Sequence, residues 1–433
     1  MPNWNDHVNI VMSRRGLLKA AGGAAAATTA LAPLATMRIP VAGAQDAVNI
    51  TIWSNHPEWQ DQNLALIEAF QAANPDVTLE LTSTPGQEYP AKLQTALAGQ
   101  QPSDVLVLLE GDIYGKYGPA GEIPCVDLTG QVDTSQLTDS ARLQVEYDGK
   151  SYGTPLASYT VGLAIQRNIL AENGVEAPTT WDELKAASQT LKDAGITPMT
   201  LGASDGVHTF FMYIGLVSSI LGPEGFPQLL SGERKLTDAD LLPGAQMLVD
   251  MREFYNEGFE ATDYVTAKAL FAQGLAAIMV AGTADFTGFA EENPDADLDF
   301  IPWPGPEAGM YATNTGYELL NTVSIYSSPE KQEAATRWVA WLAGEEAQTM
   351  VGDTIALPVN KNVTQLADPI KSRTMSVRDK DVPVWFALPE TNATFPLALE
   401  ISGQLWTGDL TPEAFAEQMQ AAIKPSGSGT PTA

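Results

Sequence analysis

The sequence predicts an α/β protein built from two lobes, and three observations support this. The chain has 433 residues, 44% of them hydrophobic, which is enough for two domains with separate cores. Strand and helix patterns alternate in the order β-α-β-α-β over residues 48–109, which is typical of a doubly wound sheet. A short hairpin pattern at 147–152 then leads through Pro155 into the apolar run 161–165, as expected where a chain leaves one lobe and becomes a buried strand of another.

The first lobe is predicted from residue 48 onward. Residues 48–52 alternate between apolar and polar side chains, as do residues 77–81, and both patterns are typical of strands. Apolar residues at helical spacing in 64–73 and a further pattern at 89–98 predict two helices. The run VLVLL, residues 105–109, is apolar on both faces, so we expect a central parallel strand.

The best-specified helix lies in APTTWDELKAASQTLKDAG, residues 177–195. Thr180 and Glu183 have the spacing of a capping box, and a glycine ends the segment. A mostly helical region is expected up to about residue 273, before the buried strand LAAIMVAG at 275–282.

A final strand and helix precede the C-terminal tail. The segment NTVSIY at 321–326 has a strand pattern, and in the next segment Ser328 is expected to cap a helix with Pro329 at its first position. The Pro-, Gly- and Ser-rich residues 425–433 are expected to form a flexible tail.

Residues 1–44 are predicted to be an export signal. Arg14 and Arg15 lie in SRRGLLK, which resembles the twin-arginine pattern S-R-R-x-F-L-K, with Leu17 at the position of the usual Phe. A weakly apolar run follows, and Ala42-Gly43-Ala44 offers a small-residue cleavage site. The alternatives are an ordinary secretory signal and a retained membrane anchor, for which the apolar run is short. We therefore expect a protein of the periplasm or the extracellular face of the membrane.

Composition excludes several classes of function. The chain carries 23 Lys and Arg against 53 Asp and Glu, a formal net charge of -30, so we expect no nucleic-acid partner. The single cysteine, Cys125, excludes an internal disulfide and a cysteine metal cluster. We expect no cofactor and a monomeric protein.

Enzymatic alternatives can be weighed from the same residues. Gly202 to Gly206 reads G-x-S-x-G, a hydrolase nucleophile motif, but the last histidine is His208, four residues after Ser204, so the triad order of that fold cannot be built. A glycosidase needs only two carboxylates, which composition does not exclude. A metal site from His56 and His208 has no supporting ligand spacing.

Five segments, in order, resemble the extracellular solute-binding proteins of ABC importers, specifically the sugar-binding group that includes maltose-binding protein. They are PSDVLVL, DGKSYGTPLASYTVGLAIQRNIL, APTTWDEL, FAQGLAAIMVAG and TNTGYELLNTVSIYSSPEKQEAATRWVAWL. The resemblance covers about residues 47–362. Two features depart from the family pattern: Gln166-Arg167-Asn168 replaces an aromatic-Asn pair, and Phe286 stands near the position of a missing cleft tryptophan.

The resemblance implies a two-lobed periplasmic-binding-protein fold in which each lobe is a doubly wound sheet flanked by helices. Three chain crossings would form a hinge, the first of them at Pro155 to Thr160, and ligand binding between the lobes would close it. The expected division is 45–157 and 282–321 for the first lobe, and 158–281 and 322–424 for the second. The implied function is capture of a mono- or oligosaccharide and its delivery to a membrane permease. A polyamine stays open as the ligand, since the candidate carboxylates suit a cation, and a polyol stays open as well.

Polar and aromatic side chains near strand ends are the expected ligand contacts, because sugars are held by paired hydrogen bonds and stacking rings. Trp59 is expected to stack on the ligand or to pack the start of a helix, and Glu110 and Asp112 to bind the ligand or to cap the next helix. Tyr159 and Tyr317 are expected to face the cleft or to pack the hinge. The full set of candidates is His56, Glu58, Trp59, Gln87, Glu110, Asp112, Tyr159, His208, Asp285, Phe286 and Tyr317.

Overall fold

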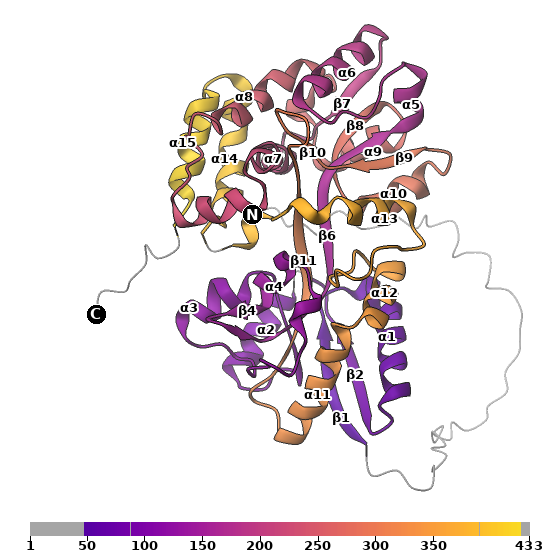
Figure 1. Cartoon of the computed structure of the whole chain (residues 1–433), viewed down its shortest axis with the longest axis vertical. Helices are drawn as coiled ribbons and strands as arrows, with labels where there is room; N and C mark the ends of the chain where they lie inside the picture. The colour runs from indigo at the N-terminus through magenta and orange to yellow at the C-terminus, as the bar shows by residue number, and fades with distance from the viewer. Residues whose placement is uncertain (1–46, 87, 389, 426–433) are drawn as a thin grey trace, which may run out of the picture.

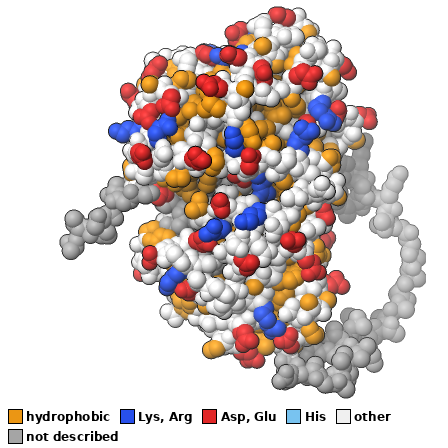
Figure 2. All heavy atoms as spheres, in the orientation of Figure 1, with side chains coloured by type: hydrophobic (Ala, Val, Ile, Leu, Met, Phe, Trp, Pro, Cys, Tyr) orange, Lys and Arg blue, Asp and Glu red, His pale blue; other side chains and the backbone are white. Residues whose placement is uncertain are grey.

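The computed structural model describes residues 47–425, except 87 and 389. The expected export signal, Gln87 and the tail after residue 425 therefore lie outside the described residues. Two α/β lobes lie one above the other in Figure 1, and the strands β6 (Gly153–Gln166) and β11 (Tyr311–Val323) run between them. Acidic side chains are spread over both lobes on the face seen in Figure 2.

One continuous sheet passes through both lobes, with the strand order β2-β1-β3-β11-β6-β8-β7. The first three strands in chain order are parallel, and β11 is antiparallel to β3 and to β6. The early half of β6 pairs with β11, and its later half pairs with β8 and β9. The hairpin expected at 147–152 forms from β4 (Glu146–Tyr147) and β5 (Lys150–Ser151).

The first lobe has the predicted β-α-β-α-β order, and the expected strands at 48–52, 77–81 and 105–109 are confirmed. Its core joins residues of the first three strands to residues from the end of β11 up to Val359. The elements of this lobe are β1 (Val48–Ser54), α1 (Gln60–Ala73), β2 (Val77–Ser83), α2 (Tyr89–Ala98), β3 (Val105–Leu108), α3 (Gly118–Ala120), α4 (Asp139–Val145), α11 (Pro329–Leu342) and α12 (Glu345–Thr354).

The second lobe surrounds α7, a helix that is buried along most of its length and kinked at Gly222. Two adjoining hydrophobic clusters form its core. The elements of this lobe are α5 (Arg167–Glu172), α6 (Trp181–Asp193), β7 (Thr197–Thr200), α7 (Val207–Ser231), α8 (Leu242–Asp250), α9 (Tyr264–Ala272), β8 (Ala276–Gly282), α10 (Asp285–Glu292), β9 (Leu298–Ile301), β10 (Trp303–Pro304), α13 (Pro369–Ser376), β12 (Asp381–Pro383), α14 (Thr394–Thr407) and α15 (Pro412–Ala422).

The predicted helix starts are partly confirmed. The Thr180 hydroxyl accepts a hydrogen bond from the Glu183 N–H at 3.2 Å, and the Glu183 carboxylate accepts one from the N–H of Thr179 at 2.8 Å. The capping box therefore forms, with its return bond shifted by one residue. Ser328 is the N-cap residue of α11 and Pro329 its first helical residue, as expected, but the Ser328 side chain makes no capping hydrogen bond.

The buried clusters group two segments differently from the expected division of the chain. Phe286, Phe289 and Phe300, expected in the first lobe, pack with residues of α9 and β8 in the second. Trp338 and Val359, expected in the second lobe, pack with the strands of the first. After β8 the Asp285 carboxylate accepts a hydrogen bond from the Gly282 N–H at 2.9 Å, and the chain continues in the same lobe, where Phe286 and Phe289 of α10 are buried. The second crossing therefore lies inside β11, and the third follows Val359.

None of the described helices is both long enough and apolar enough to span a membrane.

Candidate ligand-binding site between the lobes

The carboxyl ends of the parallel strands in the two lobes point toward each other. In the first lobe, β3 and the later-crossing strand β6 run in the same direction, since both are antiparallel to β11. In the second lobe, β8 runs the opposite way to β6, with Gly282 opposite Val161 near the crossing, and β7 is parallel to β8. Ligands of open α/β sheets bind outside the carboxyl ends of strands, so the region between the lobes is the candidate site.

A stacked pair of rings lies at the carboxyl end of β1. The His56 imidazole is 3.9 Å from the Trp59 ring, centroid to centroid, with an interplanar angle of 12°. The 3-10 helix η1 (Pro57–Trp59) brings the two residues together, and Trp59 then occupies the N-cap position of α1. The Trp59 ring is partly buried against the core of the first lobe. It therefore both packs the start of the helix and keeps part of its surface exposed.

Both nitrogens of His56 face carboxylates. Nδ1 lies 2.7 Å from an oxygen of Glu58, and Nε2 lies 3.2 Å from an oxygen of Glu318 on β11. Burial alone would lower the pKa of His56, but the hydrogen bonds and charges of Glu318 and Glu58 outweigh it and raise the pKa to about 9. His56 is therefore an imidazolium at neutral pH, and it joins the loop after β1 to the crossing strand.

Glu110, just after β3, contacts both crossing strands. Its carboxylate accepts a hydrogen bond from the backbone N–H of Tyr317 at 3.0 Å, and it is hydrogen-bonded to the Tyr159 side chain of β6. Burial, followed by the nearby charge of Glu318, raises the pKa of Glu110 well above its usual range. Glu110 therefore lies where the first lobe meets the hinge.

Asp112 is mainly a local structural residue. Its carboxylate accepts a hydrogen bond from the Leu109 N–H at 3.0 Å, and Lys116 lies 3.8 Å away. Burial raises the pKa of Asp112, and only 8% of the residue is exposed. Asp112 does not cap the helix that follows it, because Gly111 is the N-cap residue there and no side chain makes a capping hydrogen bond.

A second polar group lies at the carboxyl end of β8. The Asp285 carboxylate accepts hydrogen bonds from the Tyr264 hydroxyl at 2.8 Å and from the Lys268 ammonium at 2.6 Å. The same carboxylate holds the Gly282 N–H, as described above. Asp285 thus anchors the edge of the second lobe that faces the first, and Tyr264 and Lys268 surround it.

Three predicted ligand contacts are buried side chains. Tyr317 is 1% exposed, and its hydroxyl bonds to Ser140 at 2.5 Å, because strand alternation turns it into the first lobe. Phe286 is 5% exposed and packs edge-on against Phe289. His208 is 0% exposed. We do not retain these three residues as ligand contacts.

His208 also settles the role of the G-x-S-x-G segment. Its Nδ1 accepts a hydrogen bond from the Gly202 N–H at 2.8 Å, so the imidazole supports the loop backbone. Burial lowers the pKa of His208 to about 4, which keeps it neutral. The segment is the glycine-containing turn that leads from β7 into α7.

Sequence reasoning missed Glu318, which the fold brings to the edge of the first lobe, and two partly exposed phenylalanines of the second lobe. Glu318 follows Tyr317 in β11, and strand alternation predicts that the two side chains face opposite ways. Phe386 and Phe395 are partly exposed, lie 5.3 Å apart and pack beside Phe210 at the start of α7. Both residues are far from α7 in the sequence, so no local pattern predicted that they would pack beside it.

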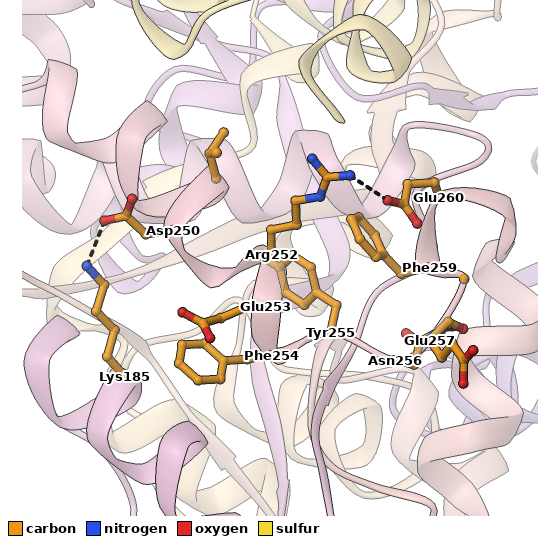
Figure 3. Close-up of a pocket in the computed structure, with 12 residues that line it drawn as sticks. Lys185, Asp250, Arg252, Glu253, Phe254, Tyr255, Asn256, Glu257, Phe259 and Glu260 are labelled. Carbon is orange, nitrogen blue, oxygen red and sulfur yellow. Dashed lines mark hydrogen bonds and ion pairs between the residues drawn. The ribbon is translucent and has the colours of Figure 1, made fainter. Parts of the chain in front are cut away.

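An open hollow lies elsewhere, on the outside of the second lobe. It has a volume of about 760 Å³ and is lined by α6, α8 and the segment 251–260 (Figure 3). Two pairs of its charged groups form ion pairs, Lys185 with Asp250 at 2.8 Å and Arg252 with Glu260 at 3.0 Å. None of the predicted ligand residues lines it. Among the described residues, no group of three His, Cys, Asp or Glu side chains is arranged to hold a metal ion.

The two lobes, the shared crossing strands and the facing strand ends define a two-lobed solute-binding protein. The chain belongs to the bacterial extracellular solute-binding proteins, a family that it matches over residues 65–376. The family consists of binding proteins, which agrees with the expectation that the chain is not an enzyme.

Relatives with named ligands share about a fifth to a quarter of their residues with the chain. The multiple sugar-binding protein of Streptococcus mutans is 20% identical over 73% of this chain and 76% of its own length. The melibiose/raffinose/stachyose-binding protein of Bacillus subtilis is 25% identical over 68% of this chain and 69% of its own. The ligand-free structure of RafE from Streptococcus pneumoniae has a TM-score of 0.74 at 18% identity, covering 88% of this chain and 98% of the other. These similarities confirm the predicted family and the two-lobed fold.

Proposed function

We propose that this protein captures a mono- or oligosaccharide between its lobes and delivers it to the membrane permease of an ABC importer. The observation that carries the proposal is the group formed by Trp59, His56 and Glu318 at the carboxyl edge of the first lobe. An aromatic ring beside carboxylates is the combination that holds sugars, since the ring stacks on C–H faces and carboxylates accept hydroxyl hydrogen bonds. The named ligands of the relatives, multiple sugars and melibiose, raffinose or stachyose, support it.

Each lobe supplies one wall of the proposed site. The first lobe offers the exposed part of Trp59 with Glu58, which is 62% exposed, and the second offers the partly exposed Tyr264, whose hydroxyl bonds to the buried Asp285. The crossing strands β6 and β11 flex between these walls. A ligand that contacts both walls favours the closed arrangement, because it gains contacts there that the open arrangement lacks.

The proposed place of action is outside the cytoplasmic membrane. Residues 1–44 carry the twin-arginine-like motif and act as the export signal. The extracellular family of the chain supports this placement. The protein then works as a monomer and requires no cofactor.

The experiment is thermal unfolding of the purified protein with a panel of maltotriose, raffinose, melibiose, xylo-oligosaccharides and spermidine. A ligand present at 100 times its Kd adds about 2.7 kcal/mol of stability, which shifts the transition visibly. We expect a shift with one class of sugar, and chromatography should recover that sugar unchanged. Shortened sugar would instead identify a glycoside-cleaving enzyme and overturn the proposal.

A cationic ligand is the second candidate, favoured by one observation. Glu58 and Glu318 flank a single imidazolium at the edge of the first lobe, so carboxylates outnumber cations there. In the same panel, a shift with spermidine and none with any sugar would select this alternative. The variant Glu58→Gln separates the two ligands further, because a cation loses more from removal of the negative charge than a neutral sugar does.

A further inference from the structure

The His56 ring lies between two kinds of partner that come from different parts of the chain. One face lies parallel to the Trp59 indole at 3.9 Å. Both ring nitrogens face carboxylates, Glu58 from the same loop and Glu318 from β11. Only the imidazolium has two N–H donors, so both contacts are satisfied when the ring is charged. A cation over an indole face is itself attractive.

This arrangement fixes the indole relative to a hinge strand. Trp59 belongs to the loop after β1, whereas Glu318 belongs to β11, which crosses between the lobes. The His56 ring contacts Trp59 and Glu58 on its own loop and Glu318 on β11, and beside Glu318 lies the carboxyl of Glu110. Through Glu110 the group continues to Tyr159 on β6. The ring therefore links the proposed sugar platform to the crossing strands.

We propose that His56 is a positioning residue that, as an imidazolium, holds the Trp59 indole in place and ties it to the crossing strand β11. The inference rests on the proposed function, since it names how that site presents its aromatic platform. The alternative is that His56 covers the platform and must move away before a ligand binds. The geometry favours positioning, because displacement would break both carboxylate contacts of a side chain that is only 19% exposed.

The first arm of the test needs no ligand and measures tryptophan fluorescence. The signal of Trp59 is the difference between the emission of the unmodified protein and that of Trp59→Phe. An imidazolium stacked on an indole quenches its fluorescence, and neutral imidazole does so far less. We expect the Trp59 signal to be weak at pH 7 and to rise as the pH passes through about 9. His56→Gln should be bright at every pH, and His56→Arg should show no transition up to pH 10 because guanidinium keeps its charge. A Trp59 signal that does not follow the charge of His56 overturns the inference.

The second arm measures the Kd for maltotriose and raffinose by titration calorimetry at pH 7 and pH 10. For whichever sugar binds, we expect the Kd of the unmodified protein to rise about tenfold at pH 10, and that of His56→Gln to be about tenfold higher at both pH values. His56→Arg should restore tight, pH-independent binding, because guanidinium can stack on Trp59 and pair with both carboxylates. The control is Glu253→Gln, in the outer hollow of the second lobe, which should behave like the unmodified protein.

The two proposals fail in different ways. Tighter binding by His56→Gln would show that His56 covers the platform and would overturn the positioning role. If the unmodified protein binds no sugar, the proposed function is overturned. The fluorescence of Trp59 would still decide whether His56 controls the position of that ring. Equal affinity of the unmodified protein and His56→Gln would overturn the inference and leave the proposed function intact.

Discussion

The carboxylate of Glu110 accepts a hydrogen bond at 3.0 Å from the backbone N–H of Tyr317. This bond joins the end of β3 to a strand that passes between the lobes. Because Glu110 is also bonded to the Tyr159 side chain, one carboxyl group contacts both crossing strands. Its pKa is raised by burial and by the charge of Glu318, so folding shifts this group toward its protonated form.

We predict that Glu110→Ala destabilises the protein by about 1–3 kcal/mol, because the Tyr317 N–H loses its acceptor. Glu110→Gln should cost much less, since its amide oxygen replaces the carboxyl oxygen without a charge. The raised pKa means that the stabilising contribution of Glu110 is present below the unfolded-state pKa and is lost as the pH rises through the folded-state pKa. Glu110→Gln should therefore flatten that part of the pH dependence. Urea unfolding from pH 4 upward measures both effects, and equal costs for the two variants would contradict this account.

The charge of His56 predicts a second way in which the free energy of unfolding depends on pH. The folded-state pKa of about 9 lies above the ordinary value of 6.5, so the contribution is complete below pH 6.5 and is lost as the pH rises through 9. The shift corresponds to at most about 3 kcal/mol. We expect the difference in free energy of unfolding between the unmodified protein and His56→Gln to shrink between pH 6.5 and pH 10. A difference that stays constant over this range would show that the His56 charge is not stabilised by Glu58 and Glu318.

The position of Gly316, before the aromatic residue in the segment TNTGYELL, requires a residue without a Cβ. A Cβ at Gly316 would lie 2.2 Å from the ring and hydroxyl of Tyr159, its partner in the β6–β11 ladder. We predict that Gly316→Ala costs on the order of 1–3 kcal/mol by displacing the tyrosine ring. Gly282→Ala is the matched control, because its nearest neighbour would be at an ordinary 3.7 Å. In a Tyr159→Ala background the cost of Gly316→Ala should nearly disappear, and an undiminished cost would rule out the ring contact as its cause.

The ion pair of Asp285 and Lys268 should couple energetically. The side chains are 10% and 31% exposed, and the ammonium lies 2.6 Å from the carboxylate. We expect a coupling of about 1–2 kcal/mol in a double-mutant cycle of Asp285→Asn and Lys268→Met, measured by chemical denaturation. The exposed pair Lys192 and Glu253, at 2.7 Å, is the control and should couple by less than about 1 kcal/mol. Strictly additive effects at Asp285 and Lys268 would show that the pair does not fix this edge of the second lobe.

Local patterns predicted most of the first lobe and one helix of the second. The strands and helices up to Leu108, the hairpin at 147–152 and the capping box of α6 follow from periodicity and turn chemistry within short windows. The division into lobes depends on which distant segments pack together. Gly282 was expected to begin a crossing, whereas the next helix, α10, packs on α9 in the same lobe. No local pattern distinguishes these outcomes.

The candidate site shows the same limit. His56, Glu58, Trp59 and Glu110 could be predicted because they directly follow strands whose carboxyl ends meet at one edge. Glu318 was missed although it neighbours Tyr317, because the sequence does not show which face of β11 is buried. The Tyr317 side chain is buried, and the Glu318 side chain on the opposite face contacts His56. Phe286 and His208 were also predicted as ligand contacts but are buried. Phe286 packs against Phe289, and His208 packs against Tyr264, and no local pattern predicts these contacts.

The central claim is that carbohydrate binds between the lobes at the Trp59 edge. The most direct measurement is titration calorimetry of the unmodified protein, Trp59→Ala and Glu253→Gln with the sugar that gives the largest thermal shift. We predict the same Kd for the unmodified protein and Glu253→Gln, and a Kd at least about tenfold higher for Trp59→Ala, because one stacked ring contributes on that scale. Unchanged binding by Trp59→Ala, or a Kd that rises only in Glu253→Gln, would contradict the account and move the site to the outer hollow of the second lobe.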